Sequence, residues 1–189
     1  MSLPTDLREV PISDEIVFKG LLFEISRVKV TLPNGKTSMR DVVRHKGGVA
    51  IVPVDDDGNV TLVRQHRIAP DEMLLEIPAG KLDTWEEDPL SAARRELEEE
   101  CGLRAAQMRL LTVMIPTPGY CTERLHIYLA TGLTHCSAHL DADEFLSVVQ
   151  MPFAEAVALA GRGELCDGKS ALGLLLASRI LQQENKGKA

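Results

Sequence analysis

Residues 79–103, AGKLDTWEEDPLSAARRELEEECGL, carry most of the excess charge of this chain. Between Asp83 and Glu100 the stretch has eight acidic residues and two basic ones, Arg94 and Arg95. Six net negative charges therefore fall in one short segment, out of a formal net charge of −7 for all 189 residues. Composition alone does not explain this concentration, so the segment indicates a specific function.

The same stretch predicts a helix over residues 89–101. Asp88 is a good N-cap, and Pro89 suits the first helical position, where its missing N–H is not needed. Gly102 fits the left-handed position that ends a helix. At about 100° per residue, one stripe of this helix is apolar and is expected to face the core. The residues of that stripe are Leu90, Ala93, Leu97 and Cys101.

Three carboxylates, Glu96, Glu99 and Glu100, share a neighbouring face because spacings of three and four residues bring side chains together. A charge run on a helix is usually a solvated face. Here, however, each like-charge pair costs about 0.2–0.5 kcal/mol, and the helix dipole disfavours anions near this end. A hard divalent cation would relieve the repulsion, and a donor set without His or Cys favours Mg²⁺ or Mn²⁺ over Zn²⁺. Such ions bind phosphates, so the residues alone predict metal-assisted hydrolysis of a phosphate or pyrophosphate.

The rest of the chain predicts a mixed α/β fold, because strands flank the charged helix and more helices follow. A hairpin is expected over residues 21–45, around a turn at 33–36. Residues 48–54 predict a buried strand with 60–68 as its antiparallel partner. Further strands are expected at 73–80, 108–117, 123–133 and 145–151, and helices at 152–163 and 169–183.

Composition limits the class of protein. The apolar fraction of 44% is ordinary for a globular chain, and no apolar run approaches the ~20 residues of a membrane span. The first residues lack the basic start and apolar stretch of a signal peptide, so a cytoplasmic location with free thiols is expected. The acidic balance argues against a broad nucleic-acid or anionic-membrane surface, and neither partner is expected.

The charged stretch resembles the Nudix box: Gly, five residues, Glu, seven residues, then Arg-Glu-apolar-x-Glu-Glu-x-Gly-apolar. Gly80 opens it, and residues 95–103, RELEEECGL, close it without a mismatch. One residue is inserted between these parts. Counting from Gly80 puts Glu86 on the Glu position, whereas counting back from Arg95 puts Glu87 there. We favour Glu87, because the spacing to the helix is then kept.

The whole chain from about residue 18 to 183 is similar to the ADP-ribose pyrophosphatase branch of the Nudix hydrolases. The similarity includes LLEIPAGKLD before the box, a Pro about fifteen residues beyond it, and the acidic LDADEF before the last strand. It implies a Nudix fold, an α/β/α sandwich with a mixed sheet, over residues 46–184. Residues 1–45 would form an N-terminal antiparallel β-hairpin that makes a homodimer, since a lone hairpin is marginally stable.

The resemblance also implies Mg²⁺-dependent hydrolysis of ADP-ribose to AMP and ribose 5-phosphate, with Mn²⁺ as an alternative ion. The competing interpretations are another substrate, such as GDP-mannose or NADH, and a non-catalytic module that senses nucleotide sugars.

Roles for the box residues follow from the resemblance. Glu96, Glu100 and the backbone carbonyl of Ala79 would hold a metal ion, and Glu99 would bind or bridge a second one. Arg95 would orient these groups through the loop Glu. The structural positions of the motif would be Gly80, Glu87 and Gly102.

A general base is expected outside the helix, because metal-bound carboxylates are poor free bases. The candidates in LDADEF are Asp141, Asp143 and Glu144, and we favour Glu144. The alternative is that all three are ordinary loop acids.

Substrate-binding residues are also implied by the resemblance. Arg67 would contact the phosphates, a task that suits a guanidinium fork. Glu76 and Pro118 occupy further positions of the substrate site. Phe18 and Phe23 lie near the place where an aromatic of the partner's hairpin recognises adenine in this branch, but core packing is the favoured interpretation for both.

Overall fold

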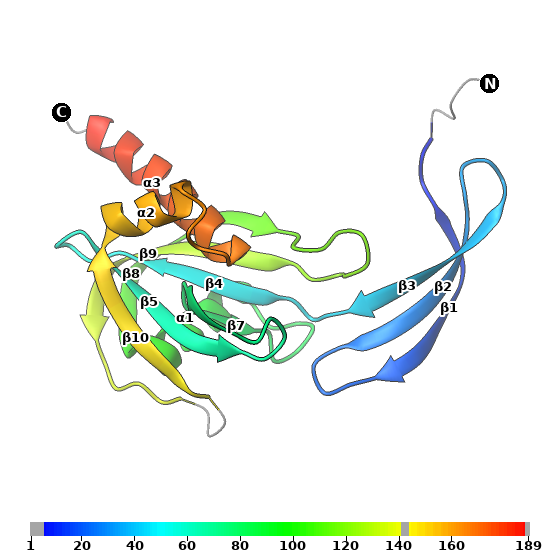
Figure 1. Ribbon diagram of the computed structural model, residues 1–189, viewed down its shortest axis with the longest axis horizontal. Helices are drawn as coiled ribbons and strands as arrows, with labels where there is room; N and C mark the ends of the chain where they lie inside the picture. Colours follow the sequence, from blue (N-terminus) through cyan, green and yellow to red (C-terminus); the bar gives the residue numbers. More distant parts are fainter. Residues whose placement is uncertain (1–5, 141–143, 188–189) are drawn as a thin grey trace. The chain divides into compact units, whose positions relative to one another are not determined.

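The structure is a computed structural model that describes residues 6–140 and 144–187, and it divides into two compact units. The first unit is Met1–Gly47 with Ile115–Glu123, and the second is Gly48–Met114 with Arg124–Ala189. The colours of Figure 1 show which parts of the sequence make up each unit. The segment 115–123 therefore belongs with the N-terminal residues, which the sequence did not indicate.

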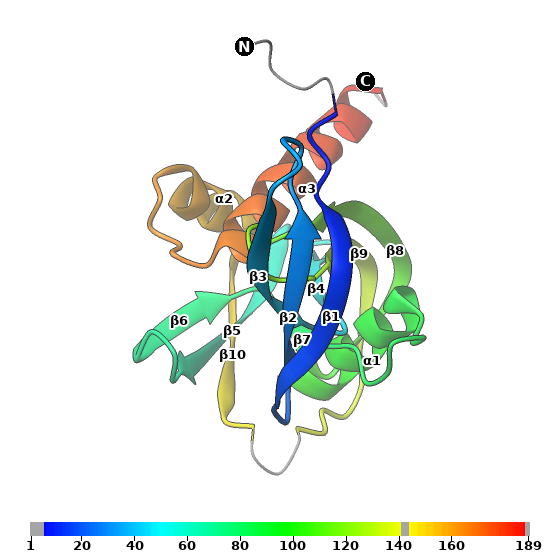
Figure 2. The same ribbon diagram turned by 90° about the vertical axis from the view of Figure 1, so that its right-hand side faces the viewer.

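The first unit contains a three-stranded antiparallel sheet with the order β1-β2-β3 (Figure 2). Its strands are β1 (Val10–Lys19), β2 (Glu24–Thr31) and β3 (Thr37–Arg44). β2 and β3 form the expected hairpin, whereas β1 is a further strand that the sequence analysis did not assign. Segment 115–123 attaches to β3: Val43 donates its N–H to the carbonyl of Tyr120 at 2.7 Å and accepts from the N–H of Thr122 at 2.9 Å.

The second unit is built around a mixed four-stranded sheet with the order β7-β4-β9-β8, in which β4 and β9 are parallel. Its strands are β4 (Gly48–Pro53), β7 (Ala79–Lys81), β8 (Leu103–Met114) and β9 (Leu125–His135). Val49 and Ile51 of β4 pack with α1 (Pro89–Cys101), whereas Ala50 and Val52 pack with α3 (Gly168–Gly187). This alternation buries both faces of β4 and confirms the predicted α/β/α sandwich (Figure 1).

A second sheet in this unit has the order β10-β5-β6. Its strands are β5 (Asn59–Arg67), β6 (Glu72–Glu76) and β10 (Leu146–Pro152), and α2 (Phe153–Gly161) follows β10. The prediction that residues 48–54 and 60–68 pair as a hairpin is wrong. An isolated bridge between Val54 and Val60 links them, but β4 is flanked by β7 and β9 and has no free edge. The chain therefore crosses into the other sheet after the turn at 55–58.

Helix α3 is the longest helix, with 20 residues, and it buries Leu174 and Ala177 in the core. Neither α3 nor any other helix within residues 6–140 and 144–187 is long and apolar enough to cross a membrane.

Candidate active site

Helix α1 has the caps that its sequence predicts. The side chain of Asp88 accepts a hydrogen bond from the N–H of Ser91 at 2.9 Å, and Pro89 occupies the first turn. At the other end Gly102 has a φ of 61°, and its N–H donates to the carbonyl of Glu98 at 3.0 Å. The expected apolar stripe packs in the core of this unit: Leu90, Ala93, Leu97 and Cys101. The register of this stripe fixes which way the carboxylates of α1 point.

Two carboxylates of α1, Glu96 and Glu100, are buried, with 7% and 4% of their surface exposed. Glu100 accepts a hydrogen bond from the N–H of Ala79 in β7 at 3.0 Å. Glu96 packs against Gly80, where an added Cβ would lie 2.0 Å from its carboxyl carbon. The structure thus brings Glu96 and Glu100 to the Ala79–Gly80 backbone, and a Cβ at position 80 would displace the Glu96 carboxylate.

The burial of this pair has an electrostatic consequence. Burial is the largest cause that raises the pKa of Glu96 to about 7 and the pKa of Glu100 to about 8. Arg95 opposes the increase at Glu96, and the Ala79 N–H opposes it at Glu100. The negative charge of Glu144 raises both pKa values further. If both groups were ionised, the pair would hold more negative charge than its neighbours neutralise, so both carboxyl groups keep their protons to a higher pH than an ordinary glutamate does.

Arg95 is the cation at the centre of this cluster. Its Nη1 donates to Glu96 at 2.8 Å and to Glu99 at 3.0 Å. Its Nη2 donates to Glu87 at 3.3 Å and lies 3.6 Å from a carboxylate oxygen of Asp83. The buried Nε has no hydrogen-bond partner in the described part of the chain. One guanidinium thus faces four carboxylates, and the cluster keeps a net negative charge.

Of the two candidate loop glutamates, the structure places Glu87 against Arg95. Glu87 is half-buried and also accepts the N–H of Asp83 at 2.6 Å, whereas Glu86 is exposed. The exposed segment 83–86 accommodates the inserted residue, so the spacing from Glu87 to Arg95 is kept. The role of Glu87 in the motif stays a prediction.

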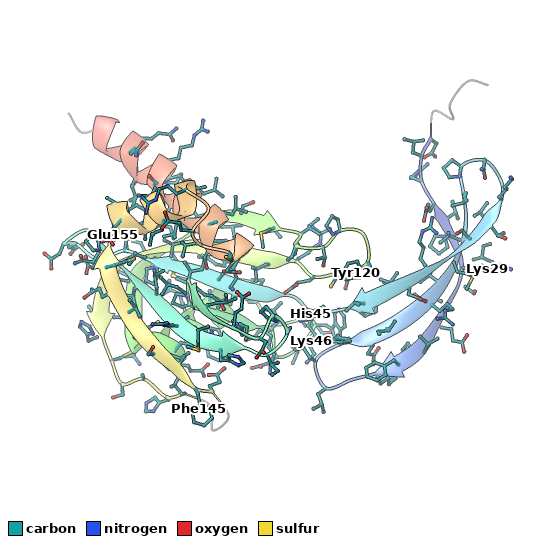
Figure 3. The ribbon with its side chains drawn as sticks, viewed as in Figure 1. Lys29, His45, Lys46, Tyr120, Phe145 and Glu155 are labelled. Carbon is teal, nitrogen blue, oxygen red and sulfur yellow. The ribbon has the colours of Figure 1, made fainter. Side chains whose placement is uncertain are left out.

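Among the candidate general bases, Glu144 is described and exposed, whereas Asp141 and Asp143 lie outside the described residues. Because the charge of Glu144 acts on both Glu96 and Glu100, it is within electrostatic range of the buried pair. Phe145, the next residue, is 85% exposed (Figure 3). The assignment of the base within this loop stays a prediction.

Arg67 and Glu76 form a bidentate ion pair between β5 and β6. Nε of Arg67 donates to Glu76 at 2.8 Å, and Nη2 donates to the other carboxylate oxygen at 2.9 Å. Lys169 at the start of α3 is a second cation on the same carboxylate. Burial acts to raise the pKa of Glu76, but the hydrogen bond from Arg67 and the charge of Lys169 outweigh it, so the pKa is lowered. The charge of Glu100 acts on Arg67, so this pair is within electrostatic range of α1.

Lys169 is a residue that sequence reasoning missed. Its Nζ also lies 2.9 Å from Asp167, and Asp167 accepts the N–H of Ser170 at 3.1 Å. The signal in the sequence was Asp-Gly-Lys-Ser at 167–170, an N-cap before an apolar run. That pattern locates a helix start, but not the contact to Glu76, which is 93 residues away in the chain.

The remaining predicted residues belong to the first unit. Pro118 is exposed, in a turn where Tyr120 donates its N–H to the carbonyl of Thr117 at 3.3 Å. Phe18 and Phe23 are 51% and 36% exposed, with ring centroids 6.4 Å apart. The interpretation of both as core residues is therefore wrong. All of β1 is exposed, so its side chains are available to a partner.

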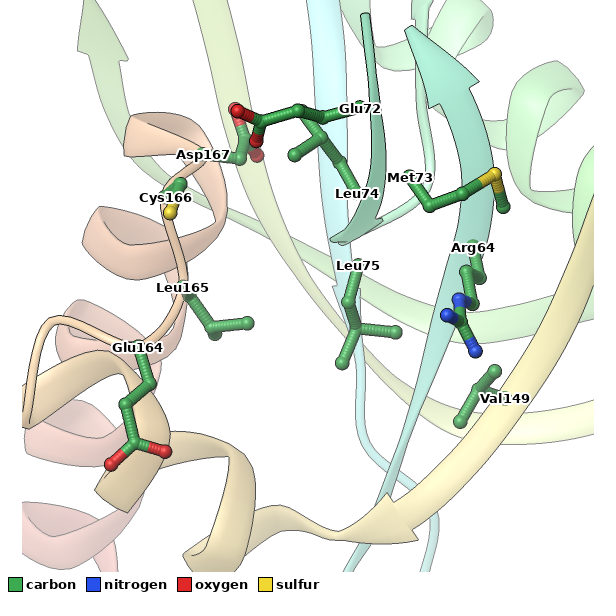
Figure 4. Close-up of a pocket in the computed structure, with 10 residues that line it drawn as sticks. All are labelled: Arg64, Glu72, Met73, Leu74, Leu75, Val149, Glu164, Leu165, Cys166 and Asp167. Atoms are coloured by element: carbon green, nitrogen blue, oxygen red, sulfur yellow. The ribbon is translucent and has the colours of Figure 1, made fainter.

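A pocket of about 350 Å³ lies on the second unit between β5, β6, β10 and the segment before α3 (Figure 4). Leu75 and Leu165 face each other across it, and Arg64 lies beside Val149. None of the box carboxylates lines this pocket, but Asp167, the partner of Lys169, does.

The chemistry of the α1 cluster fits a hard divalent cation, because its donors are carboxylate oxygens. In residues 6–140 and 144–187, no three His, Cys, Asp or Glu side chains are arranged to hold a metal ion by themselves. A cation at Glu96 and Glu100 would need further oxygen ligands, such as water or substrate phosphates. Mg²⁺ is usually bound in this way, by one or two carboxylates together with phosphates.

Comparison with known proteins gives the family. A model of the NUDIX domain matches residues 44–170. The chain is 38% identical to the ADP-ribose pyrophosphatase of Bacillus subtilis (strain 168) over 170 residues, which cover 89% of this chain and 91% of that protein. The ADP-ribose pyrophosphatase of Mycobacterium tuberculosis is 39% identical over 173 residues, covering 89% and 83% of the two chains.

Other relatives have different names. A methanol dehydrogenase activator of Bacillus methanolicus is 36% identical over 168 residues, covering 88% and 90% of the two chains. A GDP-mannose pyrophosphatase of Klebsiella pneumoniae is 30% identical over 166 residues, covering 82% and 81%.

A crystal structure of an ADP compounds hydrolase has the same fold. It superimposes with a TM-score of 0.82 at 24% identity, covering 95% of this chain and 98% of that one. The family model spans more than half of the chain, and the relatives extend over most of it. The chain therefore belongs to the Nudix hydrolase family.

Proposed function

We propose that this chain hydrolyses the pyrophosphate bond of ADP-ribose to AMP and ribose 5-phosphate, using Mg²⁺. The observation that carries the proposal is the buried pair Glu96 and Glu100 against the Ala79–Gly80 backbone, whose ionised form would hold more negative charge than Arg95 neutralises. The choice of ADP-ribose is supported by two relatives named for that activity. Hydrolases of this family generally use divalent metals, and Mg²⁺ is chosen because the donors are oxygens.

Arg67 binds the diphosphate. Glu76 engages Nε and Nη2 of Arg67 and so fixes the plane of the guanidinium. Nη1 is the nitrogen that Glu76 does not engage, and it donates to a phosphate oxygen. A fixed donor of this kind stabilises the negative charge that develops on the departing phosphate.

Glu144 removes the proton of the attacking water. The oxygen of the water forms a bond to one phosphorus, the bond from that phosphorus to the bridging oxygen breaks, and the proton passes to Glu144. The carboxylates of α1 are less suited to this task, because Glu96 accepts from Arg95 and Glu100 accepts from Ala79. Asp141 and Asp143 are the alternatives within the loop.

Glu96, Glu100 and the Ala79 carbonyl would hold the divalent cation, and Glu99 would hold or bridge a second. When bound, the cation supplies positive charge to the diphosphate and lowers the pKa of water. Arg95 orients Glu96 and Glu99 through its Nη1.

We also propose that residues 1–45 form a dimerisation element ahead of the Nudix domain at 46–184, and that the chain acts in the cytoplasm as a homodimer. The exposed apolar side chains of β1 and the following turn support this: Val10, Ile12, Ile16, Val17, Phe18, Leu21 and Leu22. A two-fold partner would bury them. Light scattering at micromolar concentration tests the proposal, and a monomer would contradict it.

A second substrate, GDP-mannose, is favoured by the relative named for that activity. Initial rates with ADP-ribose, GDP-mannose and NADH at saturating Mg²⁺, with analysis of the products, separate the candidates. We expect the highest kcat/KM for ADP-ribose, with AMP and ribose 5-phosphate as products. Faster turnover of GDP-mannose would contradict the choice of ADP-ribose and make GDP-mannose the proposed substrate. Binding of these nucleotides without turnover of any would indicate a sensor.

A further inference from the structure

The Glu76 cluster consists of four charged side chains that alternate in sign: Arg67, Glu76, Lys169 and Asp167. Glu76 is 1% exposed, whereas Lys169 and Asp167 have side chains that are 14% and 16% exposed. Lys169 lies on both carboxylates, and its contact to Asp167 is 2.9 Å. Since a buried carboxylate must be neutralised, Glu76 depends on both of its cations.

The first turn of α3 also holds the backbone next to Glu76. The hydroxyl of Ser170 donates to Asp167, and its oxygen accepts the N–H of Ile77 at 2.8 Å. Two residues further along, the N–H of Ala79 donates to Glu100. The segment from Glu76 to Ala79 is therefore fixed by α3 at one end and by α1 at the other.

The position of Arg67 depends on this arrangement. The side chain of Arg67 is 40% exposed, and within the described residues both of its hydrogen bonds are to Glu76. A carboxylate that could rotate would let the guanidinium rotate with it. Lys169 also engages the Glu76 carboxylate and is itself held by Asp167, so rotation of Glu76, and with it of the Arg67 fork, is restricted.

We propose that Lys169, itself held by Asp167, is a positioning residue that orients Arg67 through Glu76 for binding a diphosphate. The inference rests on the proposed function, because it takes Arg67 as the phosphate-binding group. Glu76 and Asp167 take two of the three N–H donors of Lys169, and its side chain is only 14% exposed, so we assign it to positioning and not to contact with substrate. The start of α3 thereby determines affinity for the diphosphate.

The first test is the change Lys169→Met in the full-length protein. Binding of ADP-ribose is measured by calorimetry in EDTA, and hydrolysis is measured separately with Mg²⁺. We expect Kd and KM to rise about ten-fold, the size of one lost charged hydrogen bond. We expect kcat to fall by up to about ten-fold as well, because Arg67 also stabilises the charge that develops on the departing phosphate. Lys169→Arg, which keeps the charge, is expected to recover most of the affinity. Arg179→Met is the matched control, because it removes a cation from an exposed position of the same helix.

A double-mutant cycle then separates positioning from a general effect on the fold. If Lys169 acts through Glu76, Lys169→Met in a Glu76→Gln background should change Kd less than two-fold. Additive effects, or a lower Tm with an unchanged Kd, overturn the proposal. If Lys169→Met does not fold, Asp167→Asn is used in its place, since the amide can still cap α3. An unchanged Kd for ADP-ribose in Asp167→Asn would also contradict the proposal.

The two measurements also separate this inference from the proposed function. Wild-type protein that binds ADP-ribose without hydrolysing it contradicts the proposed activity. The Kd values of wild type and Lys169→Met still test whether Lys169 positions Arg67. Wild-type protein that hydrolyses ADP-ribose with no response of Kd or KM to Lys169→Met contradicts the inference alone. Wild-type protein that neither binds nor hydrolyses it contradicts both.

Discussion

The two charged clusters of the second unit shift the pKa values of their buried carboxyl groups in opposite directions. On α1, Arg95 faces four carboxylates, and burial raises the pKa of both Glu96 and Glu100. In the Glu76 cluster, acids and bases alternate, and the pKa of Glu76 is lowered although less of its surface is exposed. The number of cations within hydrogen-bonding distance, and not burial alone, decides the direction of the shift.

This difference separates two uses of a buried acid. The α1 cluster has spare negative charge and can accept a divalent cation without creating an unpaired positive charge. The Glu76 cluster is already neutral, so an added cation would be repelled by Arg67 and Lys169. We therefore assign metal binding to the first cluster and the positioning of Arg67 to the second, and four predictions test the division.

The largest expected effect is on the α1 cluster. Glu100→Gln keeps the shape of the side chain and removes the charge, so kcat should fall about 10³-fold, comparable to the loss of a preorganised electrostatic group. The far-ultraviolet circular dichroism spectrum should be unchanged, because Gln can still accept from Ala79. Full turnover of the variant at saturating Mg²⁺ would remove Glu100 from the metal site.

The next effect is expected at Glu144, whose charge acts on the α1 pair from outside the helix. Glu144→Gln should lower kcat about 10²-fold or more, as the loss of a general base does, while the Mg²⁺ concentration for half-maximal rate changes little. Asp141→Asn and Asp143→Asn should have milder effects. A nearly silent Glu144→Gln beside one severe aspartate variant would move the base to that aspartate.

The third prediction concerns metal removal. Mg²⁺ at about 100 times its Kd should stabilise the folded state by roughly 2.7 kcal/mol, which corresponds to roughly 5–10 °C in Tm for a chain of this size. Glu100→Gln should abolish the increase, and Glu76→Gln should keep it, because the Glu76 cluster has no spare negative charge. An equal increase in Tm with Mg²⁺ in the two variants would show that metal binding is not confined to the α1 cluster.

The sequence was most informative where one element carries the whole signal. Helix α1, its caps and its apolar stripe follow from local spacing, because all of their contacts lie within a few residues or against the core. The buried strand β4 follows in the same way, since it is apolar along both faces. The α/β/α sandwich, in contrast, was implied by the resemblance to the Nudix family.

The failures of the sequence prediction share a physical cause. The pairing of β4 depends on which strands reach its two edges, and β7 and β9 are distant in the sequence. The contact of Lys169 with Glu76 joins β6 to α3 in the same non-local way. Periodicity describes which face of an element is apolar, but not the identity of its neighbour.

The smallest expected effect is on the pH dependence of stability. Glu76 faces Arg67 and Lys169, with Asp167 beside them, and its pKa is lowered in the folded protein. Its stabilising contribution is therefore present above the unfolded pKa, about 4.3, and is lost as the pH falls through the lower folded value. We expect Glu76→Gln to reduce the free energy of unfolding at pH 7 and to flatten its decline below about pH 4.3.

Urea unfolding between pH 3 and 7 measures this, with Glu184→Gln as the control because Glu184 makes an exposed ion pair with Arg109 on the same unit. An acid-side slope that matches wild type in Glu76→Gln would mean that Arg67 and Lys169 do not stabilise the Glu76 anion, and the contrast between the two clusters would fail.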